Sequence, residues 1–290
     1  MRIRLAKRIG FCFGVKRAIE MAEKALEYND DVYSLGSVIH NRQVVKKLSD
    51  KGLKVVRGID GIKGGTVVVS SHGISPAVAG RIREKGLKLI DTTCPFVLNA
   101  QRIAKSLGDE GYRVVIVGDS EHPEVKALRG FVPDVCVVKN KKEAMRLAVR
   151  PHSRISVISQ TTQSTANFLD VVRVITGKKP GELKVINTIC KDVEERQNSA
   201  VALARKVDAM LVIGGRNSAN TRRLFELCRK ICRNSHLLET ERDIRRGWYD
   251  TAECVGITSG ASTPDWIVKR VVEVIRVKHK AKSAKRLRKK

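Results

Sequence analysis

The chain has 290 residues, 42% of them hydrophobic, and its 57 Lys and Arg against 30 Asp and Glu give a formal net charge of +27. This length and composition predict a globular protein with a large core and exclude a disordered chain. Aromatic residues make up only 4%, which argues against a stacking platform for single-stranded nucleic acid. The basic charge favours anionic partners, such as phosphorylated ligands, acidic proteins or nucleic acid.

No apolar run reaches the length of a membrane span, and GFCFGV near the N-terminus is too short for a secretory signal. A transit peptide would have to precede Cys12, where there is no room for one. We therefore expect a cytoplasmic protein whose seven cysteines are reduced thiols or metal ligands. Residues 278–290 contain eight Lys or Arg and no acid, which predicts a disordered basic tail, with RNA contact as a secondary hypothesis for it.

Apolar, β-branched runs recur along the chain, each followed by a polar or glycine-rich turn and a helical pattern. In chain order they are TVVVS at 66–70, RVVIV at 113–117, ISVIS at 155–159 and MLVI at 210–213. Continuous apolar strands that alternate with helices indicate parallel sheets buried on both faces. The predicted fold class is therefore α/β.

An internal repeat begins at three cysteines, Cys12, Cys94 and Cys190, each of which precedes a helical run. Twenty-eight positions after each cysteine, a polar residue follows a strand-like run; these residues are His40, His122 and Ser218. A second polar loop then follows another apolar strand in every copy, at 71–75 (SHGIS), 159–164 (SQTTQS) and 258–263 (TSGAST). The chain therefore contains three copies of one plan: cysteine, helix, strand, polar loop, helix, strand, polar loop.

Ligands of open α/β sheets lie beyond the carboxyl ends of the strands, so we expect these loops and cysteines to face one cavity. Three converging thiolates predict a soft metal or a cluster. Their spacings of 82 and 96 residues, without any C-x-x-C pair, differ from those of structural zinc sites. A [4Fe–4S] cluster with three cysteines keeps one iron open to a substrate oxygen. A [3Fe–4S] cluster and a zinc site with three cysteines and a water are alternatives.

The other cysteines are expected to be buried as small hydrophobic residues; they are Cys136, Cys254 and the i, i+4 pair Cys228 and Cys232. Glu124 lies two residues after His122, and in a low-dielectric cavity its pKa would be raised and it could deliver a proton. His40, His72 and His122 lie in loops beyond strands. Hydroxyl and amide donors in the other polar loops suit a small oxyanion such as phosphate; they belong to Thr161, Thr162, Ser218, Asn220 and Ser262.

An ordered set of motifs spans residues 2–277 and resembles the LytB family of 4-hydroxy-3-methylbut-2-enyl diphosphate reductases. The motifs are GFCFGVKRA, SVIHN, SHG, DTTCP, HPEV, QTT, CKDVEERQ, GGRNSANT and SGAST. This resemblance implies a three-lobed α/β trefoil of parallel-sheet lobes around a central iron–sulfur cluster. It also implies an oxidoreductase that removes the hydroxyl of an allylic diphosphate with two electrons and two protons. The products are isopentenyl and dimethylallyl diphosphates, in the last step of the methylerythritol phosphate route to isoprenoids.

The resemblance also implies residue roles. One [4Fe–4S] cluster would be held by Cys12, Cys94 and Cys190, and the diphosphate by His40, His72, Ser218, Asn220 and Ser262. His122 and Thr161 would lie near the substrate, with Thr162 beside them, and Glu124 would relay the proton. The electron donor would be an acidic carrier such as ferredoxin or flavodoxin, steered by the basic charge. Two positions depart from the family pattern, Ala219 in place of a serine and Val193 in place of a threonine.

The expected organisation is an N-terminal strand at 1–12 that packs with the third lobe, a first lobe at 13–94, a second at 95–190 and a third at 191–277, followed by the tail at 278–290. A nucleic-acid-binding protein is the alternative from a different class, motivated by the charge. It predicts a recognised module or basic stripes with aromatic residues, and it leaves the threefold pattern of cysteines unexplained.

Overall fold

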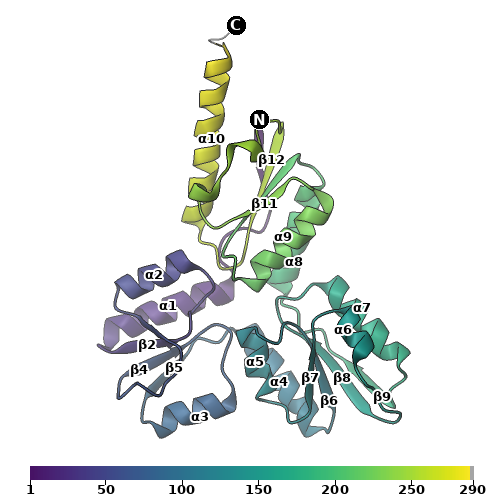
Figure 1. Cartoon of the computed structure of the whole chain (residues 1–290). Coiled ribbons are helices and arrows are strands. Elements are labelled where there is room, and N and C mark those ends of the chain that lie inside the picture. Colours follow the sequence, from purple (N-terminus) through teal and green to yellow (C-terminus); the bar gives the residue numbers. More distant parts are fainter. Residues whose placement is uncertain (288–290) are drawn as a thin grey trace. The chain divides into compact units, whose positions relative to one another are not determined.

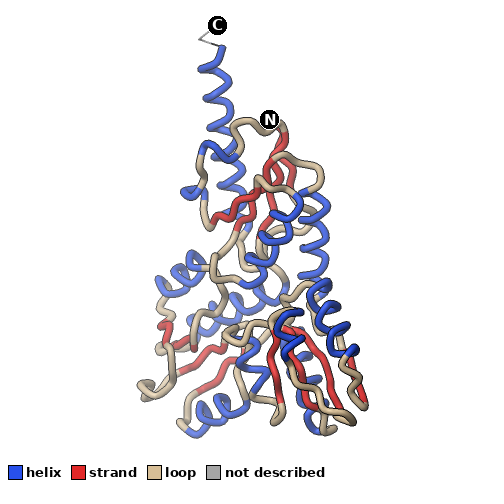
Figure 2. Tube along the Cα trace, turned by 45° about the vertical axis from the view of Figure 1, so that its right-hand side comes forward, coloured by secondary structure: helices blue, strands red, loops and turns tan. Residues whose placement is uncertain are grey.

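The computed structural model describes residues 1–287, with side chains described for these except Arg246 and 278–287. The chain forms two compact units. Unit 1 comprises Met1–Cys12, His40–Arg42 and Asp192–Lys290, and unit 2 comprises Phe13–Ile39 and Gln43–Lys191. All the sheets are parallel and have helices against them, and Figure 2 shows the strands bordered by helices.

Unit 2 contains two four-stranded parallel sheets (Figure 1), with strand orders β3-β2-β4-β5 and β7-β6-β8-β9. The strands of the first sheet are β2 (Val32–Leu35), β3 (Lys54–Val56), β4 (Thr66–Val69) and β5 (Lys88–Asp91). Those of the second are β6 (Arg113–Val117), β7 (Val135–Val138), β8 (Arg154–Ser159) and β9 (Glu182–Val185). The helices that precede, connect and follow these strands are α1 (Phe13–Tyr28), α2 (Arg42–Asp50), α3 (Pro76–Glu84), α4 (Pro95–Asp109), α5 (Pro123–Arg129), α6 (Lys141–Arg146) and α7 (Thr165–Gly177).

Unit 1 contains one four-stranded parallel sheet in the order β1-β12-β10-β11. Its strands are β1 (Arg2–Leu5), β10 (Ala209–Ile213), β11 (Ser235–Leu238) and β12 (Cys254–Ser259). Its helices are α8 (Lys191–Ala204), α9 (Ala219–Ile231) and α10 (Asp265–Leu287), with the short 3-10 helices η1 (Glu241–Asp243) and η2 (Arg246–Trp248).

The central strands are buried on both faces, as the continuous apolar runs predict. Along β10, Leu211 and Ile213 join one hydrophobic cluster with α10, while Met210 and Val212 join another with α8 and α9. Successive side chains of a strand point to opposite faces, so both faces of this sheet carry a core. The α/β class is therefore confirmed, in three parallel-sheet lobes.

The three sheets share one strand order when read from the same edge: β3-β2-β4-β5, β7-β6-β8-β9 and β11-β10-β12-β1. The last edge strand precedes a cysteine in each lobe, because β5 leads to Cys94, β9 to Cys190 and β1 to Cys12. The N-terminal strand thus completes the third sheet, with Arg2 paired to Cys254. Each lobe has four strands where the sequence plan has two, because the edge strands are only three or four residues long and four of the six carry charged residues.

The C-terminal helix α10 continues to Leu287, so residues 278–287 are helical where the sequence predicted a disordered tail. No glycine or proline interrupts this helix, and Lys, Ala, Arg and Leu are favourable helix formers. Residues 288–290 of the predicted tail lie outside the described residues, as do the side chains from 278 onward, so the RNA contact stays a prediction. In the described part of the chain, no helix is both long and apolar enough to span a bilayer.

Candidate functional site

The segments after β6 and β8 carry four of the predicted site residues in unit 2. These strands are hydrogen-bonded neighbours, with Val117 paired to Ser159 at their carboxyl ends. The chain leaves both strands at the same edge of the sheet, so the two loops begin side by side. One segment leads to His122 and Glu124, and the other leads to Thr161 and Thr162.

Glu124 is 1% exposed, and Thr161 is 5% exposed. Oε1 of Glu124 accepts a hydrogen bond of 2.6 Å from the backbone N–H of Thr161, and Oε2 lies 2.7 Å from Oγ1 of the same residue. Burial raises the pKa of Glu124 to about 7, although the two hydrogen bonds from Thr161 oppose the shift. A carboxyl group with this pKa is partly protonated near neutral pH, so the predicted raised pKa of Glu124 is confirmed.

His122 is the N-cap of α5, and its Nδ1 accepts a hydrogen bond of 3.2 Å from the backbone N–H of Glu124. Pro123 follows at the first helical position, where its fixed φ suits the start of a helix. Because Nδ1 is an acceptor, the proton of the neutral ring is on Nε2. His72 packs edge-on against this ring with 5.2 Å between the centroids, and its Nδ1 lies 3.3 Å from Oγ of Ser70.

Cys94 lies at the start of α4 without using its thiol as a helix cap. Its backbone N–H donates to the carbonyl of Ser71, at the start of the loop that holds His72. The first turn of α1 lies close to the Cys94 thiol, since a Cβ on Gly14 would be 2.4 Å from Sγ of Cys94. Burial raises the pKa of the Cys94 thiol, and the nearby charge of Glu124 raises it further.

Cys190 is tied to the same group of residues through the backbone. Its N–H donates to the carbonyl of Thr161 at 2.9 Å, and α8 begins at the next residue. The structure therefore brings together six predicted residues in unit 2, namely His72, Cys94, His122, Glu124, Thr161 and Cys190. Thr162 is adjacent in sequence, and its Oγ1 accepts a hydrogen bond of 2.7 Å from Nε2 of Gln160.

The residues of unit 2 fit a thiolate-bound metal group. All seven cysteines are thiols in the structure. Cys94 and Cys190 directly precede helices, whose N-termini favour negatively charged ligands such as thiolates. Gly14 leaves the space beside Sγ of Cys94 open where any side chain would fill it. These sulfur donors suit an iron–sulfur group, for which thiolates are the usual ligands.

Unit 1 holds the other predicted residues. The backbone N–H of Cys12 donates to the carbonyl of Ala261, and Oγ of the next residue, Ser262, donates to the carbonyl of His40 at 3.1 Å. The carbonyl of His40 also lies against Gly215, where a Cβ would be 2.6 Å away. Burial lowers the pKa of His40, and the charge of Arg222 lowers it further, so the imidazole is neutral near pH 7.

The N-terminus of α9 presents polar groups that lack hydrogen-bond partners within the described part of the chain. Ser218 caps the helix by accepting from the backbone N–H of Thr221. Asn220 is 4% exposed, and neither its Oδ1 nor its Nδ2 has a hydrogen-bond partner among the described residues; the same holds for Oγ1 of Thr221. Buried polar groups normally find partners, so this arrangement indicates a polar ligand.

Three features of the site were not predicted from the sequence: the close approach at Gly14, the unpartnered hydroxyl of Thr221, and the amide of Gln160. The repeated glycines in GGRNSANT and GFCFG were the available signal for close backbone approach. Cys228, Cys232 and Cys254 are buried as expected. Cys136 is only half-buried, which corrects the prediction for this residue, because its strand β7 lies at the edge of the sheet.

A family model described as LytB protein matches residues 3–276. A 4-hydroxy-3-methylbut-2-enyl diphosphate reductase of Geobacter metallireducens is 45% identical over 98% of this chain and 100% of its own. One of Dehalococcoides mccartyi is 42% identical over 93% of this chain and 96% of its own.

Two solved structures are also similar. One, described as (E)-4-hydroxy-3-methyl-but-2-enyl diphosphate reductase, the terminal enzyme of the non-mevalonate pathway, is 40% identical, covers 95% of this chain and 99% of its own, and has a TM-score of 0.68. The other, the corresponding reductase from Plasmodium falciparum, is 27% identical, covers 94% of this chain and 87% of its own, and has a TM-score of 0.89.

Proposed function

Because this chain belongs to the LytB family, we propose that it is an oxidoreductase that converts (E)-4-hydroxy-3-methylbut-2-enyl diphosphate to isopentenyl and dimethylallyl diphosphates. The resemblance predicted from the sequence motifs is confirmed by the family model and by relatives matched over nearly the whole chain. In this reaction the substrate takes up two electrons and two protons, its carbon–oxygen bond to the hydroxyl breaks, and water leaves. The observation that carries the proposal is the buried pair of Glu124 and Thr161 in the same unit as Cys94 and Cys190.

The metal group would be one [4Fe–4S] cluster held by Cys12, Cys94 and Cys190. When bound, such a cluster supplies electrons one at a time and a Lewis-acidic iron without a cysteine ligand. The close approach of Gly14 to Sγ of Cys94 and the positions of Cys94 and Cys190 before helices support this assignment. The electrons would come from a ferredoxin or flavodoxin.

The proton would come from Glu124 through Thr161. Oε1 of Glu124 accepts from a backbone N–H, so it is not the protonated oxygen. In the ionised state Oγ1 of Thr161 donates to Oε2 at 2.7 Å. The proton of the neutral carboxyl group would be on Oε2, and the direction of this hydrogen bond would then reverse. As Oγ1 of Thr161 receives this proton, it would donate its own proton to the departing hydroxyl of the substrate. The raised pKa of Glu124 keeps this proton available near neutral pH.

The diphosphate would be bound by neutral or protonated donors rather than by carboxylates. In unit 2, Nε2 of His122 carries a proton and His72 packs beside it. In unit 1 the unpartnered amide of Asn220 and the helix N-terminus capped by Ser218 offer donors to an anion. His40 and Ser262 complete the proposed set of diphosphate-binding residues.

The test is iron and sulfide content, a visible spectrum, and turnover of the allylic diphosphate by protein purified without oxygen, with methyl viologen as reductant. We expect a brown protein with about four irons per chain and product formation. Cys94→Ser and Cys190→Ser should lose iron, whereas Cys136→Ser should keep it. A colourless protein that contains zinc, or equal iron loss in all variants, would refute the assignment.

A further inference from the structure

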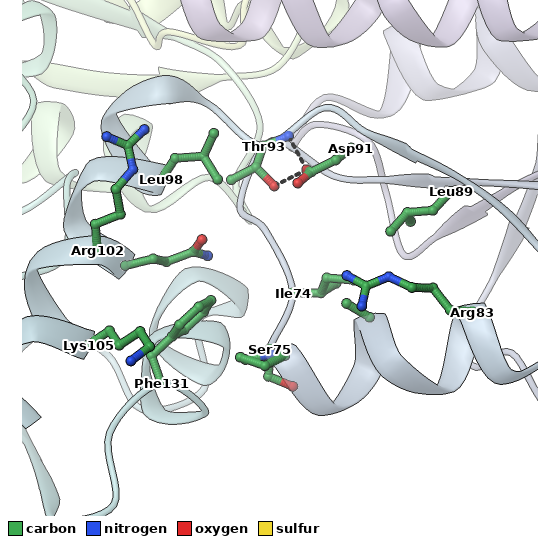
Figure 3. A pocket seen from close by; sticks show the side chains of 13 residues that line it. Ile74, Ser75, Arg83, Leu89, Asp91, Thr93, Leu98, Arg102, Lys105 and Phe131 are labelled. Atoms are coloured by element: carbon green, nitrogen blue, oxygen red, sulfur yellow. Dashed lines mark hydrogen bonds between the residues drawn. The ribbon is translucent and has the colours of Figure 1, made fainter. Parts of the chain in front are cut away.

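A pocket of about 330 Å³ opens between α3 and α4 in unit 2, and Thr93, the residue before Cys94, is among its lining residues. Figure 3 shows Arg102 and Lys105 on one side of this pocket and Arg83 on the other. Its floor is apolar, with Ile74 and Phe131 among the lining residues. The pocket therefore combines an apolar floor with a cationic rim.

The cationic side chains of the rim are unpaired or only weakly paired with carboxylates of the described residues. In the described part of the chain, Arg83 and Arg102 form no ion pair with a carboxylate. Lys105 pairs with Asp109 one turn along α4, but both side chains are more than half exposed, so this pair is weak. Asp91 also lines the pocket, and its Oδ1 is occupied by hydrogen bonds from the backbone and hydroxyl of Thr93.

A buried donor also lacks a partner at this pocket. Gln101 is 5% exposed and lines the pocket, and its Nε2 has no hydrogen-bond partner among the described residues. Leaving such a group unsatisfied costs free energy, which an acceptor oxygen entering the pocket would recover. The amide nitrogen of Gln101 and the three cations would all bind the same kind of ligand, an anion with oxygen acceptors such as a carboxylate.

The pocket lies beside a proposed cluster ligand. Thr93 lines the pocket and directly precedes Cys94, after which α4 begins. Residues 98, 101, 102 and 105 share one face of α4, and Arg102 is about 12 Å along the helix axis from Cys94 at 1.5 Å per residue. A protein seated on this face would be held within a few turns of the helix from the thiol.

We propose that this cationic pocket is the docking surface for the acidic one-electron carrier protein that reduces the enzyme at Cys94. An acidic protrusion with an apolar tip would match both the rim and the floor, and charge complementarity would steer a short-lived encounter. Two carrier molecules, each oxidised by one electron, supply the two electrons that the substrate takes up with two protons as water leaves. The inference rests on the proposed function, because it requires an electron-accepting group at Cys94.

The experiment compares two double charge reversals of equal size. Arg102→Glu with Lys105→Glu alters the pocket, and Lys142→Glu with Arg146→Glu alters exposed cations on α6 in the same unit. Each variant is assayed for turnover with a reduced acidic ferredoxin and, separately, with methyl viologen. If the original protein forms no product with either reductant, the proposed function itself is refuted. This outcome is distinct from a failure of the docking proposal, in which the original protein forms product with both reductants.

We expect the pocket variant to raise the KM for ferredoxin about tenfold or more at low ionic strength, with viologen-driven turnover unchanged. The control variant should change the KM for ferredoxin much less, and high salt should narrow the difference between the variants because it screens the rim. The inference is overturned if the pocket variant keeps its KM for ferredoxin, or if the control variant raises it equally. Inorganic phosphate could also raise the unfolding temperature of the original protein but not that of the pocket variant. If the pocket variant shows this loss and keeps its KM for ferredoxin, the pocket binds a small anion instead.

Discussion

Glu124 and Thr161 lie 37 residues apart in the sequence, yet both carboxylate oxygens of Glu124 are hydrogen-bonded to Thr161. The contact is made inside the protein, where Glu124 is almost completely shielded from water. Burial favours the protonated carboxyl group, while the two hydrogen bonds favour the carboxylate. The balance leaves a carboxyl group that can give up a proton near neutral pH.

The first prediction concerns Glu124→Gln. The amide oxygen can still accept from the backbone of Thr161, and the amide nitrogen can donate to its hydroxyl, so the loop geometry is preserved. The variant has no proton to deliver, and we expect kcat to fall by about 100-fold or more. Iron content and substrate binding should stay at the level of the original protein. Near-normal turnover would remove Glu124 from the mechanism.

The second prediction concerns the hydroxyl of Thr161. Thr161→Val keeps the shape of the side chain but removes the step through Oγ1, so turnover should fall, and Thr161→Ser should restore most of it. The valine also removes a hydrogen bond that lowers the pKa of Glu124. The pKa of Glu124 should therefore rise further, and residual activity should extend to higher pH. A pH profile that is the same for both variants would contradict the relay.

The third prediction concerns stability against pH. The pKa of Glu124 is raised from 4.5 to about 7 on folding, so between these values the folded state binds more protons than the unfolded state. Its contribution is complete below pH 4.5 and is lost as pH rises through about 7, a loss of about 3 kcal/mol. The free energy of unfolding of Glu124→Gln should not show this decrease as the pH rises. Urea unfolding of both proteins from pH 4 to 8 measures it, and a constant difference between their free energies of unfolding would contradict it.

The fourth prediction tests the close approach of α1 to Cys94. A Cβ in Gly14→Ala would lie 2.4 Å from Sγ of Cys94 and would displace the thiol, so iron content should fall. The matched control is Gly80→Ala on α3, where the nearest atom to the new Cβ is 3.9 Å away. That control should keep its iron and gain up to about 1 kcal/mol of stability from helix propensity. Full iron loading of Gly14→Ala would show that the contact does not matter.

The fifth prediction concerns Asn220, whose buried amide has no partner among the described residues. In Asn220→Ala, the KM for the diphosphate should rise, because a donor to the anion is lost. The ligand-free protein should lose little stability, since an unsatisfied buried amide costs about 1–3 kcal/mol that the alanine avoids. Asn198→Ala, at an exposed position on α8, is the control and should change neither quantity. Strong destabilisation without a change in KM would make Asn220 structural.

The central strands could be predicted because their residues are apolar on both faces. Val67, Val68 and Val69 of β4 are fully buried, and such a run is visible in the sequence without any alignment. The edge strands that carry charged residues could not be predicted in the same way. In β5, Lys88 and Asp91 are exposed, so the strand forms through hydrogen bonds to β4 rather than through a local pattern.

The cysteines and the Glu124 region could be predicted because their chemistry is local to short motifs. The partners of these residues could not be, since Glu124 meets Thr161 only after β6 and β8 pair in register. The same holds for Gly14, which meets Cys94 only when α1 packs against the start of α4. Close approach and hydrogen bonding between distant segments depend on tertiary packing.

By itself, the sequence determined the α/β class, the threefold repeat and the family, because strand hydrophobicity and motif order are properties of the chain. Only the tertiary structure decided which residues share an environment. It buried Glu124 and raised its pKa, left the amide nitrogens of Asn220 and Gln101 without hydrogen-bond partners among the residues that the structure describes, and opened a cationic pocket that Thr93 lines. These properties arise from desolvation and from contacts between segments, neither of which exists in the unfolded chain.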